Sequence, residues 1–137
     1  MPLASEWSLQ KAVFAVLEAD LTIAGLIGVG HIHDDTPQGG TFPYVTFGQS
    51  LARDWSTGTE TGAEHVLTLH VWSRSPGKKE AQAIMRALRQ ALHDQPLALE
   101  DHRLVNLRHE FSDTSRDPDG ETVHGIVRFR AVTEVLV

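Results

Sequence analysis

The chain has 137 residues, a formal net charge of −6 at neutral pH and no cysteine. This length fits one domain with one hydrophobic core, and the proportions of 41% hydrophobic and 22% charged residues are those of a globular protein. The lack of cysteine excludes disulfides, zinc–thiolate sites and cysteine nucleophiles. The acidic charge argues against a protein that grips nucleic acid, because phosphates require a dense basic face. The closest approach to such a face is the pair Arg128 and Arg130, which alternate onto one side of a strand.

A membrane span is not expected. The longest apolar stretch, Leu21 to Val29, is interrupted by Thr22, Gly25 and Gly28 and is far shorter than the roughly 20 residues that a span needs. The segment Met1 to Leu9 has no cationic region before an apolar one, so a secretory signal is not expected either.

The first expected element is a helix from about Ser5 to Asp20. Its apolar residues recur with helical spacing, at Leu9, Val13, Val16 and Leu17. Ser5 or Ser8 is expected to cap its start, since serine is a favoured N-cap residue. Phe14, beside the stripe, is expected in the core, whereas Trp7 belongs to a fraying end.

A short helical turn and several strand-like segments follow. Leu21 to Gly30 fits a short helical turn, and His31-Ile32-His33 fits a short strand before a loop rich in Pro and Gly. The residues from Tyr44 to Leu51 alternate as a strand. The polar stretch Arg53 to Gly62 predicts a long hairpin arm or a mobile loop. The clearest alternation in the chain runs from His65 to Trp72.

The second half opens with a strong amphipathic helix, Lys78 to His93. Its apolar face comprises Ala81, Ile84, Met85, Leu88, Ala91 and Leu92. Pro96 follows the helix, and Leu97 to Leu99 fits a short strand.

Two longer strands complete the chain. The first, Leu104 to Phe111, is expected to place Val105, Leu107 and Phe111 on one face. Asp117-Pro118-Asp119-Gly120 is a strong turn signal. The last strand, Thr122 to Val137, carries one buried face, composed of Val123, Val127, Phe129, Ala131, Thr133 and Val135.

The order of helix, strands, helix, strands predicts the α+β class. We expect one domain over residues 1–137, with a largely antiparallel sheet and two helices packed on one face.

Candidate metal and catalytic groups are few. His31 and His33 share a strand face and precede Asp34 and Asp35, but a third ligand would have to come from elsewhere, so a polar strand end is the favoured interpretation. Asp117-x-Asp119-Gly120 lacks the remaining oxygen ligands of a calcium loop. No metal, cofactor or catalytic residue is therefore assigned, and the signatures HExxH, GxSxG, GxGxxG and GxxxxGK[ST] are missing.

Four further histidines fall on predicted strands. His65 and His70 differ by five positions and should face opposite sides of their strand. His109 and His124 are expected as cross-strand neighbours across the turn at Asp117, which could form a pH-sensitive pair, although a structural role is favoured.

Four stretches together resemble a family of small phage tail-completion proteins. They are LQKAVFAVLEAD, HIHDDTPQGGTFPYVTFGQ, EHVLTLHVWSRSPGKKEAQAIMRALRQALHD and HRLVNLRHEFSDTSRDPDGETVHGIVRFRAVTE. The similarity runs from about Leu9 to Glu134 and leaves the role of Met1 to Ser8 open. It is carried mainly by Phe42-Pro43-Tyr44-Val45, by Trp72-Ser73-Arg74 and by the turn at Asp117. The chain resembles in particular the tail terminators of long-tailed phages and of gene transfer agents.

This resemblance implies a homo-oligomeric ring, a hexamer, in a virion or phage-like particle assembled in the host cytoplasm. Such a ring would end tail-tube polymerisation, bind the tail tube protein and the head–tail connector protein, and let DNA pass transiently through its lumen. No catalytic residue is implied. Two other functions fit the same sequence: another head–tail connector or tail-completion role on this fold, and a small bacterial α+β binding module or enzyme.

Partner surfaces can be proposed from the same pattern. A closed ring uses two different complementary patches on each subunit, and unpaired sheet edges suit that purpose. Two polar hairpins, Arg53–Gly62 and Asp113–Glu121, could reach the tube and the connector, although both also fit ordinary polar loops. The candidate interface residues are Arg53, Asp54, Trp55, Arg116, Asp117 and Asp119.

Overall fold

The computed structural model describes residues 4–136, which form one five-stranded sheet and three helices. The strands are β1 (Ile32–His33), β2 (Tyr44–Asp54), β3 (Gly62–Ser73), β4 (His102–Arg116) and β5 (Val123–Val135), and their order across the sheet is β1-β2-β3-β5-β4. Neighbouring strands are antiparallel except for the short parallel pair of β1 with β2. The predicted α+β class with a largely antiparallel sheet is confirmed.

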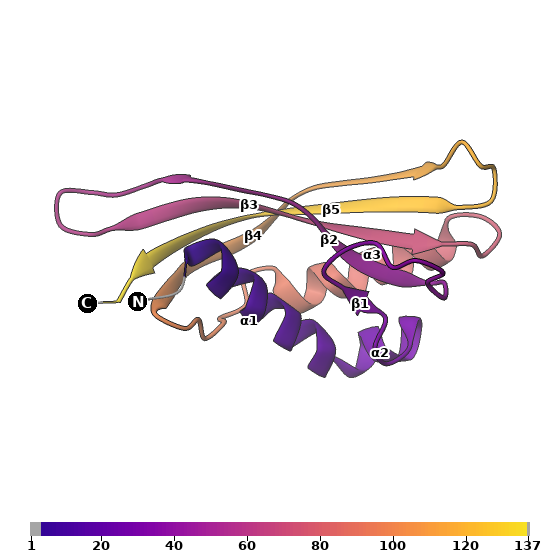
Figure 1. The fold of residues 1–137 in the computed structure, drawn as a ribbon, viewed down its shortest axis with the longest axis horizontal. Helices are drawn as coiled ribbons and strands as arrows, with labels where there is room; N and C mark the ends of the chain where they lie inside the picture. The colour runs from indigo at the N-terminus through magenta and orange to yellow at the C-terminus, as the bar shows by residue number, and fades with distance from the viewer. Residues whose placement is uncertain (1–3, 137) are drawn as a thin grey trace.

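The helices α1 (Ser5–Ala19), α2 (Leu21–Ile27) and α3 (Lys79–Leu92) all lie on the same side of the sheet (Figure 1). The helical turn predicted at Leu21 to Gly30 is thus a short helix of its own, α2, which brings the number of helices within residues 4–136 to three. Asp20 starts it, because its Oδ1 accepts a hydrogen bond from the Ile23 N–H at 2.9 Å. Most of the predicted stripe of α3 is buried: Ala81, Ile84, Met85, Leu88 and Leu92 are inaccessible or nearly so, and Ala91 is half-buried.

The core lies between this helical layer and the sheet. Alternate residues of β3 and β5 face the helices, as expected from their spacing, and comprise His65, Leu67, Leu69, Val71, Val123, Val127, Phe129, Ala131 and Thr133. Val135, expected on the same face, is half-buried, and Val137 lies outside the described residues. We call the other side of the sheet the outer face; it carries Arg53, Glu64, His70, Trp72, Phe111, His124, Arg128 and Arg130.

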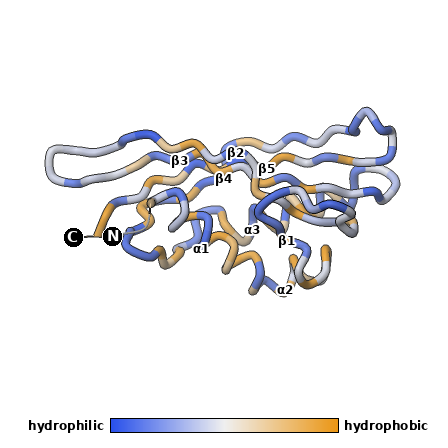
Figure 2. Tube along the Cα trace, in the orientation of Figure 1, coloured by the Kyte–Doolittle hydropathy of each residue, from blue (hydrophilic) through white to orange (hydrophobic). Residues whose placement is uncertain are grey.

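Two hairpins project from opposite ends of the molecule. The β2–β3 hairpin forms one end, and the β4–β5 hairpin with its turn at residues 117–122 forms the other (Figure 1). Figure 2 shows that the β4–β5 turn is mostly hydrophilic, whereas the helices carry both apolar and hydrophilic stretches. The predicted arm at Arg53–Gly62 is therefore a hairpin, but Arg53 and Asp54 belong to β2 itself.

Two expectations about α1 were wrong. No serine side chain caps this helix: Ala4 is the N-cap residue, and the buried Ser8 hydroxyl instead donates to the Glu100 carbonyl oxygen at 2.6 Å. Phe14 is 39% exposed, because it lies outside the buried side of the helix, which is formed by Ser8, Leu9, Val13 and Leu17.

The expected face of the fourth strand was also wrong. Leu107 is buried, but Val105 and Phe111 are 47% and 44% exposed. The pairing of β4 with β5 shifts between Leu104 and Asn106 and again between His109 and Phe111. Each irregularity moves the following side chains to the other face, so a simple alternation cannot hold along β4. The predicted strand Leu97 to Leu99 is reduced to a single bridge between Ala98 and Arg103.

The predicted cross-strand pair of His109 and His124 does not form. Because β4 and β5 both continue to the turn, His109 lies opposite Phe129 and His124 lies opposite Ser115. His124 instead meets His70 of β3, with 2.6 Å between His70 Nδ1 and His124 Nε2.

Candidate assembly surfaces

A charged cluster lies on the outer face at the base of the β2–β3 hairpin. Glu64 of β3 accepts from two arginines, Arg53 Nε at 2.9 Å and Arg130 Nη2 at 2.5 Å. The Trp55 side chain is 51% exposed, and the Arg130 guanidinium lies over its ring, 5.3 Å from the centroid. Two of the predicted interface residues, Arg53 and Trp55, are therefore brought together by Glu64 and Arg130. The sequence singled out Arg130 only as part of a basic strand face, and it did not single out Glu64.

Asp54 has a local role in the same hairpin. Its Oδ1 accepts from the Ser56 hydroxyl at 2.5 Å and from the Ser56 N–H at 3.0 Å. These two hydrogen bonds hold the pKa of the Asp54 carboxyl below its ordinary value. The carboxylate thus shapes the turn that leads out of β2.

The β4–β5 turn is organised by Asp119. Its carboxylate accepts from the N–H groups of Glu121 and Thr122 and from the Thr122 hydroxyl, at 2.9, 2.8 and 2.7 Å. These bonds, the hydroxyl first, lower the pKa of Asp119 to about 2. Arg116 Nη1 donates to the Gly120 carbonyl oxygen at 3.3 Å, so it also stabilises the turn.

The six predicted interface residues thus form two separate groups. Arg53, Asp54 and Trp55 lie at one end of the sheet, and the turn residues Arg116, Asp117 and Asp119 lie at the other (Figure 1). They cannot meet in one site of a single subunit, but they are suitably placed for two different neighbours.

An aromatic cluster that sequence reasoning missed lies on the outer face near the β4–β5 turn. The rings of Trp72 and His124 stack with centroids 4.0 Å apart and planes 5° from parallel, and His70 stacks on His124 at 4.8 Å. Burial lowers the pKa of both histidines, and the nearby Asp117 carboxylate partly offsets this for His124. The sequence indicated only that His70 and Trp72, two positions apart on one strand, face the same side. His124 joins them because β5 pairs with β3 in a register that the sequence does not specify.

A groove of about 620 Å³ lies beside α1, on the helical side of the molecule. The exposed rings of Trp7 and Phe14 line it, with Lys11 on the helix side and Asp34 and Asp35 on the loop side. Gln10 Nε2 donates to Asp34 Oδ1 at 2.5 Å and fixes the loop to the helix.

The candidate metal ligands do not converge. His31 Nδ1 lies 2.9 Å from the Pro43 carbonyl oxygen, and His33 contacts the edge of Tyr44. Among residues 4–136, no group of three or more His, Asp or Glu side chains is placed to hold a metal ion. Nor does this part of the chain contain a helix long and apolar enough to cross a membrane.

Comparison with known proteins agrees over almost the whole chain. The family model of tail completion protein gp17 matches residues 11–134. Tail completion protein gp17 of Bacillus phage SPP1 is 28% identical over 123 residues, which is 90% of each chain.

Solved structures show the same likeness. One chain, from the virion of a native gene transfer agent particle, is 30% identical, with a TM-score of 0.87 over 96% of this chain and 99% of that one. The structure of gp17 from bacteriophage SPP1 has the same fold, with a TM-score of 0.62 at 24% identity over 97% of this chain and 91% of that one. The chain therefore belongs to the tail completion protein gp17 family, and it is a structural component of a phage-type tail and not an enzyme.

Proposed function

We propose that this protein is the tail terminator of a phage or gene transfer agent. Copies of the chain close into a ring, most simply a hexamer, on the head-proximal end of the tail tube. The ring stops polymerisation of the tube, binds the head–tail connector on its other side and lets DNA pass through its lumen.

The main support is the likeness to a chain of a gene transfer agent virion. It extends over 96% of this chain and 99% of that one, so it covers almost every element of the fold. The family description adds a role in completing a tail. A protein that completes a tail must contact the finished tube and present something new to the head.

The arrangement of the two hairpins suits this position. They project from opposite ends of one sheet, so one can contact the tube while the other contacts the connector (Figure 1). Their chemistry differs as well: the β2–β3 hairpin presents Trp55 and Arg53, whereas the β4–β5 turn presents Arg116 and carboxylates. Two unlike ends favour two unlike partners.

Passage of DNA is compatible with the charge of the subunit. The net charge is −6, and on the outer face Arg53 and Arg130 are already paired with Glu64. Glu64 offsets part of the charge of these two arginines, and an acidic subunit would hold DNA only weakly.

The proposed position can be tested by labelling. A short epitope inserted at Gly30, an exposed position in the turn between α2 and β1 and outside both hairpins, should leave the fold unchanged. Gold-labelled antibody should then mark the junction of head and tail in electron micrographs of intact or partly disrupted particles. Label at the distal tip, or along the tube, would contradict the proposal.

A further inference from the structure

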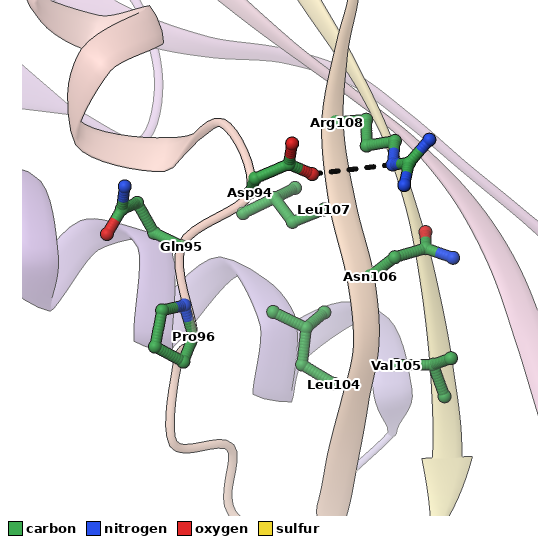
Figure 3. Close-up of a pocket in the computed structure, with 8 residues that line it drawn as sticks. All are labelled: Asp94, Gln95, Pro96, Leu104, Val105, Asn106, Leu107 and Arg108. Carbon is green, nitrogen blue, oxygen red and sulfur yellow. Dashed lines mark ion pairs between the residues drawn. The ribbon is translucent and has the colours of Figure 1, made fainter.

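The edge of β4 that faces away from β5 is covered by other parts of the chain along only half of its length. The Asp94 N–H donates to the Leu107 carbonyl oxygen at 2.8 Å, and the His109 N–H donates to His93 Nδ1 at 3.0 Å. Figure 3 shows the loop after α3 running beside this part of the strand, held by an ion pair of 3.4 Å between Asp94 and Arg108. Nearer the start of β4, Arg103 forms an isolated β-bridge with Ala98.

The remainder of this edge, Phe111–Arg116, has no such cover. Among residues 4–136, no backbone hydrogen bond reaches it from outside the β4–β5 hairpin. We call it the β4 free segment. An uncovered strand edge is a template for another strand, and natural proteins usually protect it.

The opposite edge of the sheet shows the same division. β1 covers β2 only at Val45 and Thr46. Beyond this pair, within the described part of the chain, Gly48–Asp54 receives no backbone hydrogen bond on its outer side. We call this the β2 free segment. The sheet therefore has one free segment at each edge, and the two lie toward opposite ends of the molecule (Figure 1).

We propose that, in the assembled ring, the β4 free segment of one copy pairs antiparallel with the β2 free segment of the next copy. The proposal rests on the ring of the proposed function and names its contact. β2 and β4 run antiparallel to each other within one sheet, so a neighbouring sheet in the same orientation presents the required direction. The contact is heterologous and can close into a ring.

Strand β1 and the loop after α3 cover the other halves of the two sheet edges, and their positions determine how far the neighbouring subunit is displaced along the strands. A neighbour must slide along the strand direction by about half of β4 before the two free segments overlap, and the loop after α3 and strand β1 then pass each other without collision. Such a stagger between strands is what closure of a sheet into a barrel requires. Strand β1 and the loop after α3 therefore permit pairing only when the neighbouring subunit is displaced along the strands. Without this displacement the two segments would collide.

Side chains at the two edges are complementary in one register. If Arg53 lies opposite Asp113 of the neighbour, then Trp55 lies opposite Phe111 and Leu51 lies opposite Ser115. On the outer face this gives one ion pair and one pair of aromatic rings, which stabilise antiparallel neighbours. Trp55 and Phe111 are now 51% and 44% exposed.

Both charges are available for this contact. The Arg53 side chain is 65% exposed, and its partner Glu64 is already bound by Arg130. Asp113 is exposed and makes no ion pair within residues 4–136. Neither residue has to leave a buried position to pair with the neighbour.

The natural lack of cysteine allows a direct test by cross-linking. In this register, Leu51→Cys and Ser115→Cys place two thiols on adjacent strands, where Cβ atoms lie about 4.5–5.5 Å apart and a disulfide can form. Leu51→Cys with Val105→Cys is the matched control, because Val105 is similarly exposed but lies on the covered half of β4. Each variant should replace the wild-type protein in producing cells, and purified particles should be oxidised and run on a non-reducing gel.

We expect disulfide-linked oligomers from the Leu51→Cys/Ser115→Cys variant, and monomers from the control and from each single cysteine. Particles with normal tails whose Leu51→Cys/Ser115→Cys subunit stays monomeric would overturn the strand pairing, while the proposed function would stand. If deletion of the protein leaves tail length unchanged, the proposed function itself fails.

A charge exchange decides the matter should the cysteine pair fail to assemble. Arg53→Glu and Asp113→Arg should each lower the yield of capped tails by roughly tenfold, since the repulsion recurs at every contact of the ring. The combined variant should recover part of that yield, since the carboxylate introduced at position 53 still lies beside Glu64 of its own subunit. A combined variant no better than either single one would refute the register.

Discussion

Replacing Leu88 by alanine should lower the free energy of unfolding by about 2–5 kcal/mol, the usual cost of removing a fully buried leucine side chain. Leu88 has no exposed surface and lies in the middle of α3, between the other helices and the sheet. The alanine would leave a cavity that rigid strands on the other side cannot fill. Urea unfolding of the purified variant measures the loss.

Gln90→Ala is the matched control, because Gln90 is exposed on the same helix and alanine is a good helix former. It should unfold within about 0.5 kcal/mol of wild type. If Leu88→Ala unfolds like wild type but fails to form capped tails, α3 is an assembly interface and the assignment of the core is wrong.

Acidification should destabilise the protein between about pH 7 and pH 5, the range in which an unfolded histidine gains its proton. The principal cause is His65, which is 1% exposed in the core. Its Nε2 lies 2.9 Å from the Thr133 hydroxyl, and its Nδ1 has no partner among the described residues. Burial lowers the pKa of His65, and Glu6 partly offsets this.

The sign follows from proton binding. Below about pH 6.5 this histidine gains a proton in the unfolded chain, whereas in the folded chain it stays neutral to lower pH. The free energy of unfolding therefore falls as the pH falls. One such histidine contributes up to about 1.4 kcal/mol per pH unit. Burial also lowers the pKa of His70 and His124, which act in the same direction but are less buried.

A double variant separates His65 from the other groups. His65→Leu with Thr133→Val replaces both hydrogen-bonding partners by apolar groups, so stability at about pH 8 should change little. Urea unfolding at about pH 8 and pH 5 should then show a smaller loss than in wild type. An equal loss in the double variant would assign the acid sensitivity to other residues.

Much of the fold could be predicted because it depends on local periodicity. The stripe of α3 and the alternation in β3 and β5 each bury one face against a single layer, and both patterns hold in the structure. The shifted face of β4 could not be predicted. A β-bulge depends on the partner strand, and nothing in the residues between Leu104 and Phe111 indicates where the pairing slips.

The candidate surfaces were predictable only in outline. Composition located the two polar hairpins, and Arg128 and Arg130 do share the outer face as their spacing indicated. Their partners come from distant strands: Glu64 from β3 binds Arg130, and the Phe111 ring lies 5.2 Å beneath Arg128. These contacts require the order β3-β5-β4, which a single sequence does not specify.

The most direct measurement of the central claim is the length of tails made without this protein. Its gene should be deleted in the producing cells, and tails and heads should be counted by electron microscopy, with the wild-type gene restored as the control. If the protein caps the tube, the deletion should give tails of widely varying length and heads without tails, and restoration should return one length. Tails of normal length attached to heads in the deletion strain would contradict the account.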